Sequence, residues 1–360
     1  MNLIFYRTLP MELSRLSTSW IRTLKMLEAF QKMGCNVYEI TGYQKERKEK
    51  IRKIWDSLNR FDLLYMESAT IPFFLTEKHH LPTPIFMDVI FFNECKRRGL
   101  FLSVFYRDIH WVFLELNSFL RRIFFTPFHK LELKIFNRYF NKIYLPSDKM
   151  KKYISGVDGE KMDTLPPGHS LYHFFENRKL NQPLKLFYIG GIGQVYKMHK
   201  LFKVLKELPV NLYLYFRKSD WEKVKNEYEL SENIFIIFEE KQNLNEMYSN
   251  VDLSLFFLEP IEYLSFALAH KLFEYIGFEK PIIASEGTAV SEFVKQNDIG
   301  WVIKYDEQEF KGLIEHIINN PEEVMNKIEN IRKIKNMHTW IKRAEKVIND
   351  AQEYINKNKH

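Results

Sequence analysis

The chain is poor in cysteine and contains no long hydrophobic run, and each shortage excludes a class of protein. Cys35 and Cys95 are too few for a disulfide framework or a cysteine-rich zinc site. No apolar run reaches the roughly 18 residues that a membrane-spanning helix needs. The opening MNLIFYRTLP has neither the basic start nor the long apolar core of a secretory signal. We therefore expect a soluble protein of the reducing cytoplasm.

Positive charge is concentrated in one part of the sequence. The formal net charge is +7, but residues 96–152 hold 13 basic and four acidic residues, a net charge of +9. Within a helix expected at 112–140, an apolar stripe runs beside a basic one, formed by Phe128, Leu131, Ile135 and Tyr139 and by Lys130, Lys134, Arg138 and Lys142. This pattern suits an anionic membrane surface, although a core helix with a solvated basic face has the same pattern. We expect residues 119–142 to contact the inner face of a membrane, and we expect no nucleic-acid partner because no recognised module is present.

Apolar runs with strand character alternate with helical patterns along the whole chain. In the first half the expected strands are 2–6, 36–41, 62–66, 83–89, 100–106 and 142–147. In the second half they are 184–191, 211–216, 233–238, 251–257, 281–285 and 300–303. Strand, helix, strand at this spacing predicts parallel sheets covered by helices on both faces. We expect an α/β protein with a first domain at 1–178, a second at 179–335 and a C-terminal helix within 336–360 that packs back on the first domain.

Ligands of open parallel sheets bind at the carboxyl ends of the strands, so we searched these ends for polar residues. In YIGGIGQVY, Gly190, Gly191 and Gly193 follow a strand, which suits either close approach to a phosphate or a plain tight turn. In HKLFEYIGFEKPIIAS, Glu274 has the position to accept hydrogen bonds from two adjacent hydroxyls, as on a ribose. The alternative is a helix-surface glutamate paired with Lys271 or Lys280.

A third strand end, FYRDIHW, gathers Arg107, Asp108, His110 and Trp111 within five positions. A cation, an acid, an imidazole and an aromatic ring together suit a sugar-like or phosphorylated ligand, although a lone histidine is more often structural. The stretches LPSDKM and LPPGHS favour a structural interpretation, as a turn after a strand and a rigid link between domains.

A family resemblance lies in the content and order of five stretches: KLFEYIGFEKPIIAS, EFVKQNDIGWVI, YIGGIG, LPSDKM and LPPGHS. In these stretches the sequence resembles GT-B glycosyltransferases of the family 4 (group 1) type. The resemblance implies two Rossmann-like doubly wound domains facing across a cleft, with the nucleotide-sugar bound mainly by the second and the acceptor by the first. It implies ribose binding by Glu274 and places the loop with Gly287 and Thr288 near the diphosphate or sugar. It also matches His110 to a cleft histidine that faces the transferred sugar, and we group Asp108 and Arg107 with it as catalytic candidates.

The sequence departs from the family pattern at several positions. Phe266 stands where a first glutamate is usual, and Gly191 stands where an arginine is usual. We expect Arg217 and Lys271 to neutralise the diphosphate, with Lys197 and Lys200 as further candidates. RTLPMELSRLST replaces the usual glycine-rich loop and indicates a specialised acceptor. The residues expected at the acceptor are Arg7, Ser14, Ser17 and Trp111.

These features predict a glycosyltransferase of the hexosyl type that moves a sugar from a UDP-sugar to a saccharide acceptor carried on a lipid, in cell-surface polysaccharide assembly. Family resemblance favours retention of the anomeric configuration. No Asp-x-Asp pair is present, so we expect no metal and no cofactor besides the donor substrate. The alternatives are a nucleotide-sugar epimerase of the same fold and a non-catalytic, membrane-associated protein that kept the fold.

Overall fold

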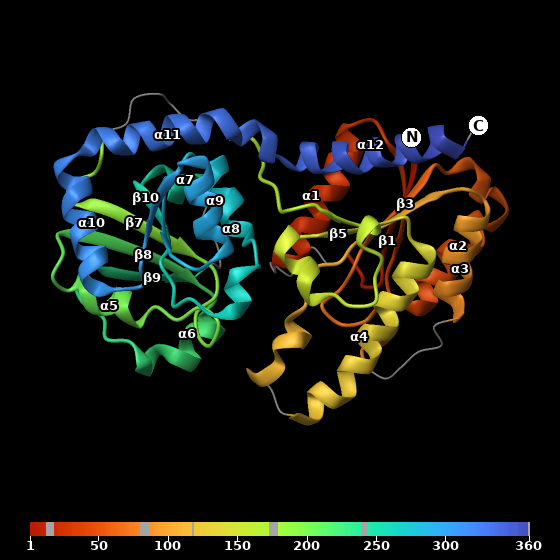
Figure 1. The fold of residues 1–360 in the computed structure, drawn as a ribbon, viewed down its shortest axis with the longest axis horizontal. Coiled ribbons are helices and arrows are strands. Elements are labelled where there is room, and N and C mark those ends of the chain that lie inside the picture. Colours follow the sequence, from red (N-terminus) through yellow and green to blue (C-terminus); the bar gives the residue numbers. More distant parts are fainter. Residues whose placement is uncertain (12–17, 80–85, 117–118, 173–178, 239–243, 359–360) are drawn as a thin grey trace. The chain divides into compact units, whose positions relative to one another are not determined.

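The computed structural model describes residues 1–11, 18–79, 86–116, 119–172, 179–238 and 244–358. The chain divides into two compact units, each built on a parallel sheet (Figure 1). Unit 1 comprises Met1–Gly168 together with Trp340–His360, and unit 2 comprises His169–Thr339. The boundary expected near residue 178 lies outside the described residues. In the part of the chain that is described, no helix is long and apolar enough to cross a membrane.

Unit 1 contains a six-stranded sheet in the order β2-β1-β3-β4-β5-β6, with every pair parallel. Its strands are β1 (Asn2–Arg7), β2 (Asn36–Thr41), β3 (Leu63–Glu67), β4 (Phe101–Phe105), β5 (Lys142–Leu145) and β6 (Met162–Thr164). Its helices are α1 (Thr18–Lys32), α2 (Gln44–Ile54), α3 (Phe86–Arg97), α4 (Phe119–Tyr139) and α12 (Trp340–Asn358). Short 3-10 helices are η1 (Trp55–Arg60), η2 (Phe73–Leu75), η3 (His110–Leu116), η4 (Asp148–Tyr153) and η5 (Gly159–Lys161).

Successive side chains of a strand point to opposite faces of the sheet, and the helices of unit 1 use both faces. Leu3 and Phe5 of β1 belong to a core cluster that includes residues of α1 and α12. Helices α1 and α12 lie side by side over this face (Figure 1). The next residue, Tyr6, points the other way and packs on Phe91 and Phe92 of α3.

The strand expected at 83–89 is wrong, because Phe86–Arg97 forms helix α3. The apolar run there is too short to distinguish a strand from the first turn of a helix. The helical spacing becomes clear only further along, where Phe91, Phe92 and Cys95 are buried. Strand β6 was not expected, since its sequence Met-Asp-Thr is short and polar. Its three residues are only partly buried at the edge of the sheet.

Unit 2 contains a second six-stranded parallel sheet, in the order β12-β11-β10-β7-β8-β9. Its strands are β7 (Leu184–Ile189), β8 (Val210–Phe216), β9 (Ile234–Phe238), β10 (Leu253–Phe256), β11 (Ile282–Ser285) and β12 (Gly300–Ile303). Its helices are α5 (His199–Leu205), α6 (Lys218–Val224), α7 (Leu244–Ser249), α8 (His270–Gly277), α9 (Ala289–Asn297), α10 (Glu307–Asn319) and α11 (Pro321–Lys335). The 3-10 helices are η6 (Lys225–Glu227), η7 (Glu262–Ser265) and η8 (Asn336–His338).

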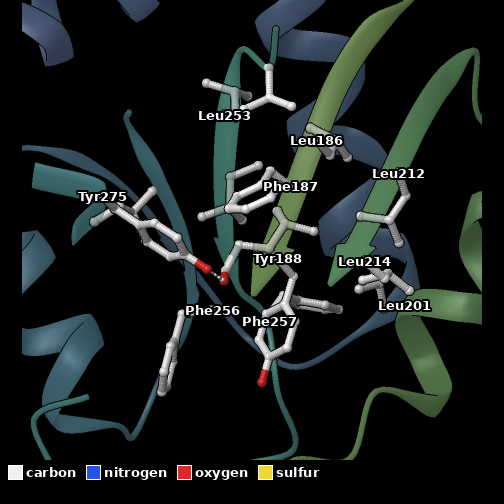
Figure 2. Close-up of a cluster of buried hydrophobic side chains, with 14 of the residues drawn as sticks. Leu186, Phe187, Tyr188, Leu201, Leu212, Leu214, Leu253, Phe256, Phe257 and Tyr275 are labelled. Atoms are coloured by element: carbon white, nitrogen blue, oxygen red, sulfur yellow. Dashed lines mark hydrogen bonds between the residues drawn. The ribbon is translucent and has the colours of Figure 1, made fainter. Parts of the chain in front are cut away.

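The core of unit 2 is formed by strand side chains and by residues of α8. Figure 2 shows the Tyr275 ring near Phe187, and the two ring centroids lie 6.2 Å apart. Leu186, Leu212 and Leu253 of the strands belong to the same cluster. The buried Tyr275 hydroxyl donates to the carbonyl oxygen of Leu255, at 3.3 Å, and accepts from the N–H of Ile189. These two bonds fix α8 against the adjacent strands β7 and β10.

Both sheets are doubly wound, and each has one point at which the direction of winding reverses. In unit 1 this topological switch point lies between β1 and β3, and in unit 2 it lies between β7 and β10. The carboxyl ends of these strand pairs are where open α/β sheets bind ligands. The prediction of two doubly wound parallel sheets is confirmed.

Candidate functional site at the carboxyl ends of two parallel sheets

Lys271 lies at the switch point of unit 2. Its Nζ is 3.7 Å from the ring centroid of Tyr188 in β7, 4.9 Å from that of Tyr196 and 5.3 Å from that of Phe256 at the end of β10. We call these three rings the aromatic cage. An ammonium group over ring faces gains cation–π energy, which partly replaces its lost hydration.

Among the described residues, Lys271 has no hydrogen-bond partner. The side chain is buried. Burial therefore holds the pKa of Lys271 well below its usual value, while the charge of Glu274 acts in the opposite direction. A buried amine of this kind can bind an anion and gain a proton when the anion arrives.

Gly190 makes room for the lysine. Its φ of +138° suits glycine, and a Cβ at this position would lie 2.8 Å from Nζ of Lys271. The carbonyl of Gly191 accepts from the Tyr188 hydroxyl at 2.8 Å, and the carbonyl of Gly193 accepts from the N–H of Tyr196 at 2.9 Å. The glycine segment thus folds as a tight turn that also lets the lysine approach the backbone.

Glu274 lies one turn after His270 in α8, with its carboxylate 3.4 Å from the histidine Nδ1. Its side chain is 17% exposed, so solvent reaches the carboxylate. Among the described residues it forms no ion pair with either lysine that was weighed as its partner, and Lys280 donates to the carbonyl of Val251. The carboxylate therefore has room for a further donor.

Two adjacent residues at this edge of unit 2, Gly287 and Thr288, have clear local roles. Thr288 is the N-cap of α9: its hydroxyl oxygen accepts from the N–H of Ser291 at 3.0 Å, and its hydroxyl donates to the carbonyl of Ser285. Gly287, with φ +83°, supplies the left-handed turn before the cap. The hydroxyl of Thr288 is buried and committed to the helix start.

The other expected cations of unit 2 are on the surface, each near a carboxylate. Nζ of Lys197 lies 3.6 Å from Glu259, Nε of Arg217 lies 3.8 Å from Asp220, and Nζ of Lys200 lies 3.7 Å from Asp306. All three side chains are more than 40% exposed. Lys271 alone of the four is buried, and this distinction could not be read from the sequence.

At the switch point of unit 1, the residues group around Glu67, which ends β3. One carboxylate oxygen accepts from Nε of Arg22 at 3.1 Å and from the Tyr65 hydroxyl at 2.6 Å. The other accepts from the guanidinium of Arg107 at 3.2 Å. Arg107 also donates to the carbonyl of Ser68. Sequence reasoning missed Glu67 and Arg22; a carboxylate ending the apolar run of β3 was the available signal.

The remaining residues of the FYRDIHW segment take different partners. Asp108 caps the following turn, accepting from the N–H groups of Ile109 and His110. Its second carboxylate oxygen lies 4.0 Å from Nδ1 of His110, whose side chain is 39% exposed. Trp111 is buried, donates to the Tyr106 hydroxyl at 3.0 Å, and stacks on His129 with ring centroids 4.9 Å apart.

The other residues expected at the acceptor are Arg7, which is buried at the end of β1, and Ser14 and Ser17, which lie outside the described residues. Across the described ranges, no group of three or more potential metal-ligating side chains comes together.

Comparisons with known proteins agree with this architecture. Residues 172–334 match the family model described as glycosyl transferases group 1. Anabaena Alr3699/HepE, crystallised in complex with UDP and glucose, has a TM-score of 0.65 at 12% identity, covering 98% of this chain and 100% of that one. WaaG, a glycosyltransferase involved in lipopolysaccharide biosynthesis, has a TM-score of 0.59 at 13% identity, covering 96% of this chain and 98% of that one.

A glycosyltransferase from Rickettsia africae ESF-5 has a TM-score of 0.64 at 11% identity, with 98% of each chain covered. A search of the curated proteins finds no match. The structural neighbours establish the fold, and the family model covers nearly all of unit 2. The chain therefore has the GT-B fold, and its unit 2 resembles the group 1 glycosyl transferases.

Proposed function

We propose that the chain transfers a sugar from a UDP-sugar to a saccharide acceptor carried on a lipid, with Lys271 binding the donor diphosphate. The observation that carries this proposal is a buried amine with no hydrogen-bond partner at the switch point of unit 2, in the segment that matches the family model. The UDP complexes of HepE support a uridine nucleotide as the donor.

The residues around Lys271 suit a nucleoside diphosphate. Glu274 offers a solvent-accessible carboxylate about one turn further along α8, on the same side of the helix as Lys271. The turn with Gly190, Gly191 and Gly193 carries no bulky side chain that would keep a phosphate from the backbone. We assign the N-terminus of α9, after Gly287 and Thr288, to the same anion as a source of positive potential.

The reaction follows from this assignment. The acceptor hydroxyl forms a bond to the anomeric carbon, the bond from that carbon to the diphosphate oxygen breaks, and the acceptor's proton passes to the departing diphosphate. A protonated Lys271 stabilises the charge that develops on the leaving group, without a metal ion. We assign retention of configuration to this transfer, with His110 and Asp108 on the side of the transferred sugar.

A lipid-linked acceptor is supported by the surface of helices α3 and α4, which pack on each other. Phe86 and Ile90 of α3 are 70% and 55% exposed, and Leu131 of α4 is 38% exposed. Lys130 and Lys134 flank Leu131 and are also exposed, whereas Ile135 is buried. Exposed apolar side chains among lysines suit an anionic bilayer. The polysaccharide assembly assigned here has a parallel in WaaG, which acts in lipopolysaccharide biosynthesis.

The donor site is tested by calorimetry with UDP, GDP, dTDP and ADP on the full chain. We expect UDP to bind, and we expect Lys271→Met and Glu274→Gln to weaken binding about tenfold or more, because each removes a charged contact to the ligand. Lys295→Met and Glu315→Gln, exposed residues of the same unit, are the matched controls. Titration in buffers of different ionisation enthalpy should show proton uptake in the wild type and none in Lys271→Met.

Two outcomes would overturn the proposal. Failure of all four nucleotides to bind would leave the fold without a donor site. Conversion of the UDP-sugar to its epimer with no acceptor present would indicate an epimerase instead. Membrane contact is tested separately, by sedimentation with anionic vesicles: Phe86→Ser with Ile90→Ser should reduce binding, and Leu230→Ser, at an exposed leucine of unit 2, should not.

A further inference from the structure

A second cluster of cations lies at the switch point of unit 1, and nothing in the donor site uses it. Arg7 ends β1, Glu67 ends the adjacent strand β3, and Arg107 follows β4. Arg7 and Glu67 are paired in register across the two strands. Arg22 enters the same cluster from α1. The position is equivalent to that of Lys271 in unit 2, since both lie at the carboxyl ends of the strands where winding reverses.

The cluster has more positive than negative charge. Both oxygens of Glu67 are taken, one by Arg22 and one by Arg107. No carboxylate of the described residues forms an ion pair with Arg7, and its guanidinium lies 4.0 Å over the Trp20 ring. Its one hydrogen bond to a described residue goes to the sulfur of Met11, at 3.8 Å. Arg7 is only 4% exposed, so most of its five N–H donors are removed from water with no oxygen acceptor in the described part of the chain.

The neighbouring charges do not cancel this excess. Burial and the charge of Arg107 lower the pKa of Arg7 to about 10, while Glu67 acts in the opposite direction. Asp108 is close enough to influence Arg107, and Arg343 of α12 is close enough to influence Arg22. These two additions are one acid and one base, so the described residues of the cluster keep an excess of two positive charges. A buried charge without a counter-ion is unfavourable, and an anionic ligand relieves it.

The cluster is open to solvent on one side. The side chain of Arg107 is 13% exposed, that of Asp108 is 22% exposed and that of His110 is 39% exposed. An anion that enters beside Arg107 would meet a planar guanidinium group, which matches the two oxygens of a phosphate or a carboxylate.

We propose that Arg7 and Arg107 form an anion site in unit 1 that binds a phosphate or carboxylate group of the acceptor. This inference rests on the proposed function, because unit 2 has its own buried cation for the donor diphosphate. It names the chemistry of the acceptor: a saccharide that carries an acidic group, either a phosphate that links it to a lipid or the carboxylate of an acidic sugar.

The test uses the full chain and inorganic phosphate as the probe, measured by calorimetry beside UDP. We expect Arg7→Gln to weaken phosphate binding about tenfold or more and to leave UDP binding unchanged. Arg7→Lys keeps the positive charge but loses the planar guanidinium group, so we expect a smaller loss of phosphate affinity than in Arg7→Gln. Arg7→Lys also provides a folded variant for the test if Arg7→Gln does not fold. Arg52→Gln, an exposed arginine of α2 in the same unit, is the control and should bind both probes normally.

The outcomes separate this site from the donor site. Phosphate binding that persists in both Arg7 variants would overturn the anion site. Loss of UDP binding in a folded Arg7→Lys variant would also overturn the assignment, because the anion would then belong to the donor. If UDP fails to bind the wild type while phosphate binding still depends on Arg7, the proposed function fails and the anion site stands. With acceptors, a phosphorylated saccharide should compete with phosphate and its neutral counterpart should not.

Discussion

Units 1 and 2 both place positive charge at the switch point of a parallel sheet, but they stabilise it differently. In unit 1, Arg22 and Arg107 share the buried carboxylate of Glu67. In unit 2, Lys271 has aromatic rings around it, and its amine has no hydrogen-bond partner among the residues that the structure describes. Arginine keeps its charge in either setting, whereas a buried lysine can lose its proton. The charge in unit 1 is therefore permanent, and the charge in unit 2 depends on what binds.

Removing the shared carboxylate should produce the largest change. Glu67→Gln removes the buried carboxylate that Arg22 and Arg107 share, and we expect the free energy of unfolding to fall by about 3–5 kcal/mol. Urea denaturation at pH 7 measures it. Glu94→Gln removes a carboxylate that pairs with the exposed Arg97 and the half-buried Arg98, and it should change stability little. If the two variants were equally stable, the ion pairs around Glu67 would not hold unit 1 together.

A second buried carboxyl of unit 1 has no cation beside it, which sharpens the comparison with Glu67. Glu132 of α4 accepts from the N–H of Phe73 at 2.9 Å, and burial raises its pKa to about 8. Its folded pKa exceeds the ordinary value of 4.5, so its contribution to stability is complete below pH 4.5 and is lost as the pH rises through 8.

Glu132→Gln keeps the hydrogen-bond acceptor and removes the titration. We expect the variant to match the wild type below pH 4.5 and to become more stable than it towards pH 8, by at most about 1.4 kcal/mol per unit of pKa difference. Thermal unfolding from pH 4 to pH 8.5 gives the difference between the two proteins. His129 also titrates abnormally, with a pKa lowered to about 3, but it is present in both proteins. A difference in stability between the wild type and Glu132→Gln that does not change with pH would contradict the raised pKa of Glu132.

Lys271→Met should have the opposite sign to Glu67→Gln. The variant removes an unpaired buried amine and leaves an apolar chain within the aromatic cage, so we expect a gain on the order of 1–3 kcal/mol at pH 7. The lowered pKa means that wild-type stability rises with pH towards 10.5, and this rise should be absent in the variant. Urea denaturation at pH 7 and pH 9 measures both effects, with Lys295→Met as the surface control. A loss of stability at pH 7 would show that the amine has a partner in solution.

The smallest expected change in stability comes from Thr288, and it tests whether the Thr288 hydroxyl only caps α9 or also contacts the donor. Thr288→Ala removes the N-cap of α9 and should lower stability by about 1 kcal/mol, while Thr288→Ser should restore it. UDP affinity, measured at a temperature where both variants are folded, should stay within about twofold of the wild type. A much larger loss of affinity in Thr288→Ala that serine restores would show that the hydroxyl contacts the donor.

The sequence predictions were accurate where a feature depends on residues close together in the chain, and less accurate where it depends on residues far apart in the chain. Strands such as 184–191 and 211–216 were recognised because a strand buried on both faces needs a continuous apolar run, which is a local property. The run at 83–89 failed because its apolar residues serve equally well as the first turn of α3. The four polar residues of FYRDIHW were expected to act together. They diverge because Arg107 turns to Glu67 on β3 and Trp111 turns to His129 on α4.

The sequence by itself determined the two doubly wound sheets, because the burial of a strand is written in neighbouring positions. It also named Lys271 and Glu274 of α8 as candidates for the donor site, and this remains a prediction. Only the tertiary structure decided which of several cations is buried. Lys197, Lys200, Arg217 and Lys271 are alike in the sequence, and the rings that surround one of them come from β7, β10 and the turn before α5. The pairing of Glu67 with Arg22 and Arg107 likewise joins residues 40 or more positions apart, and the order of the strands together with the packing of α1 brings them together.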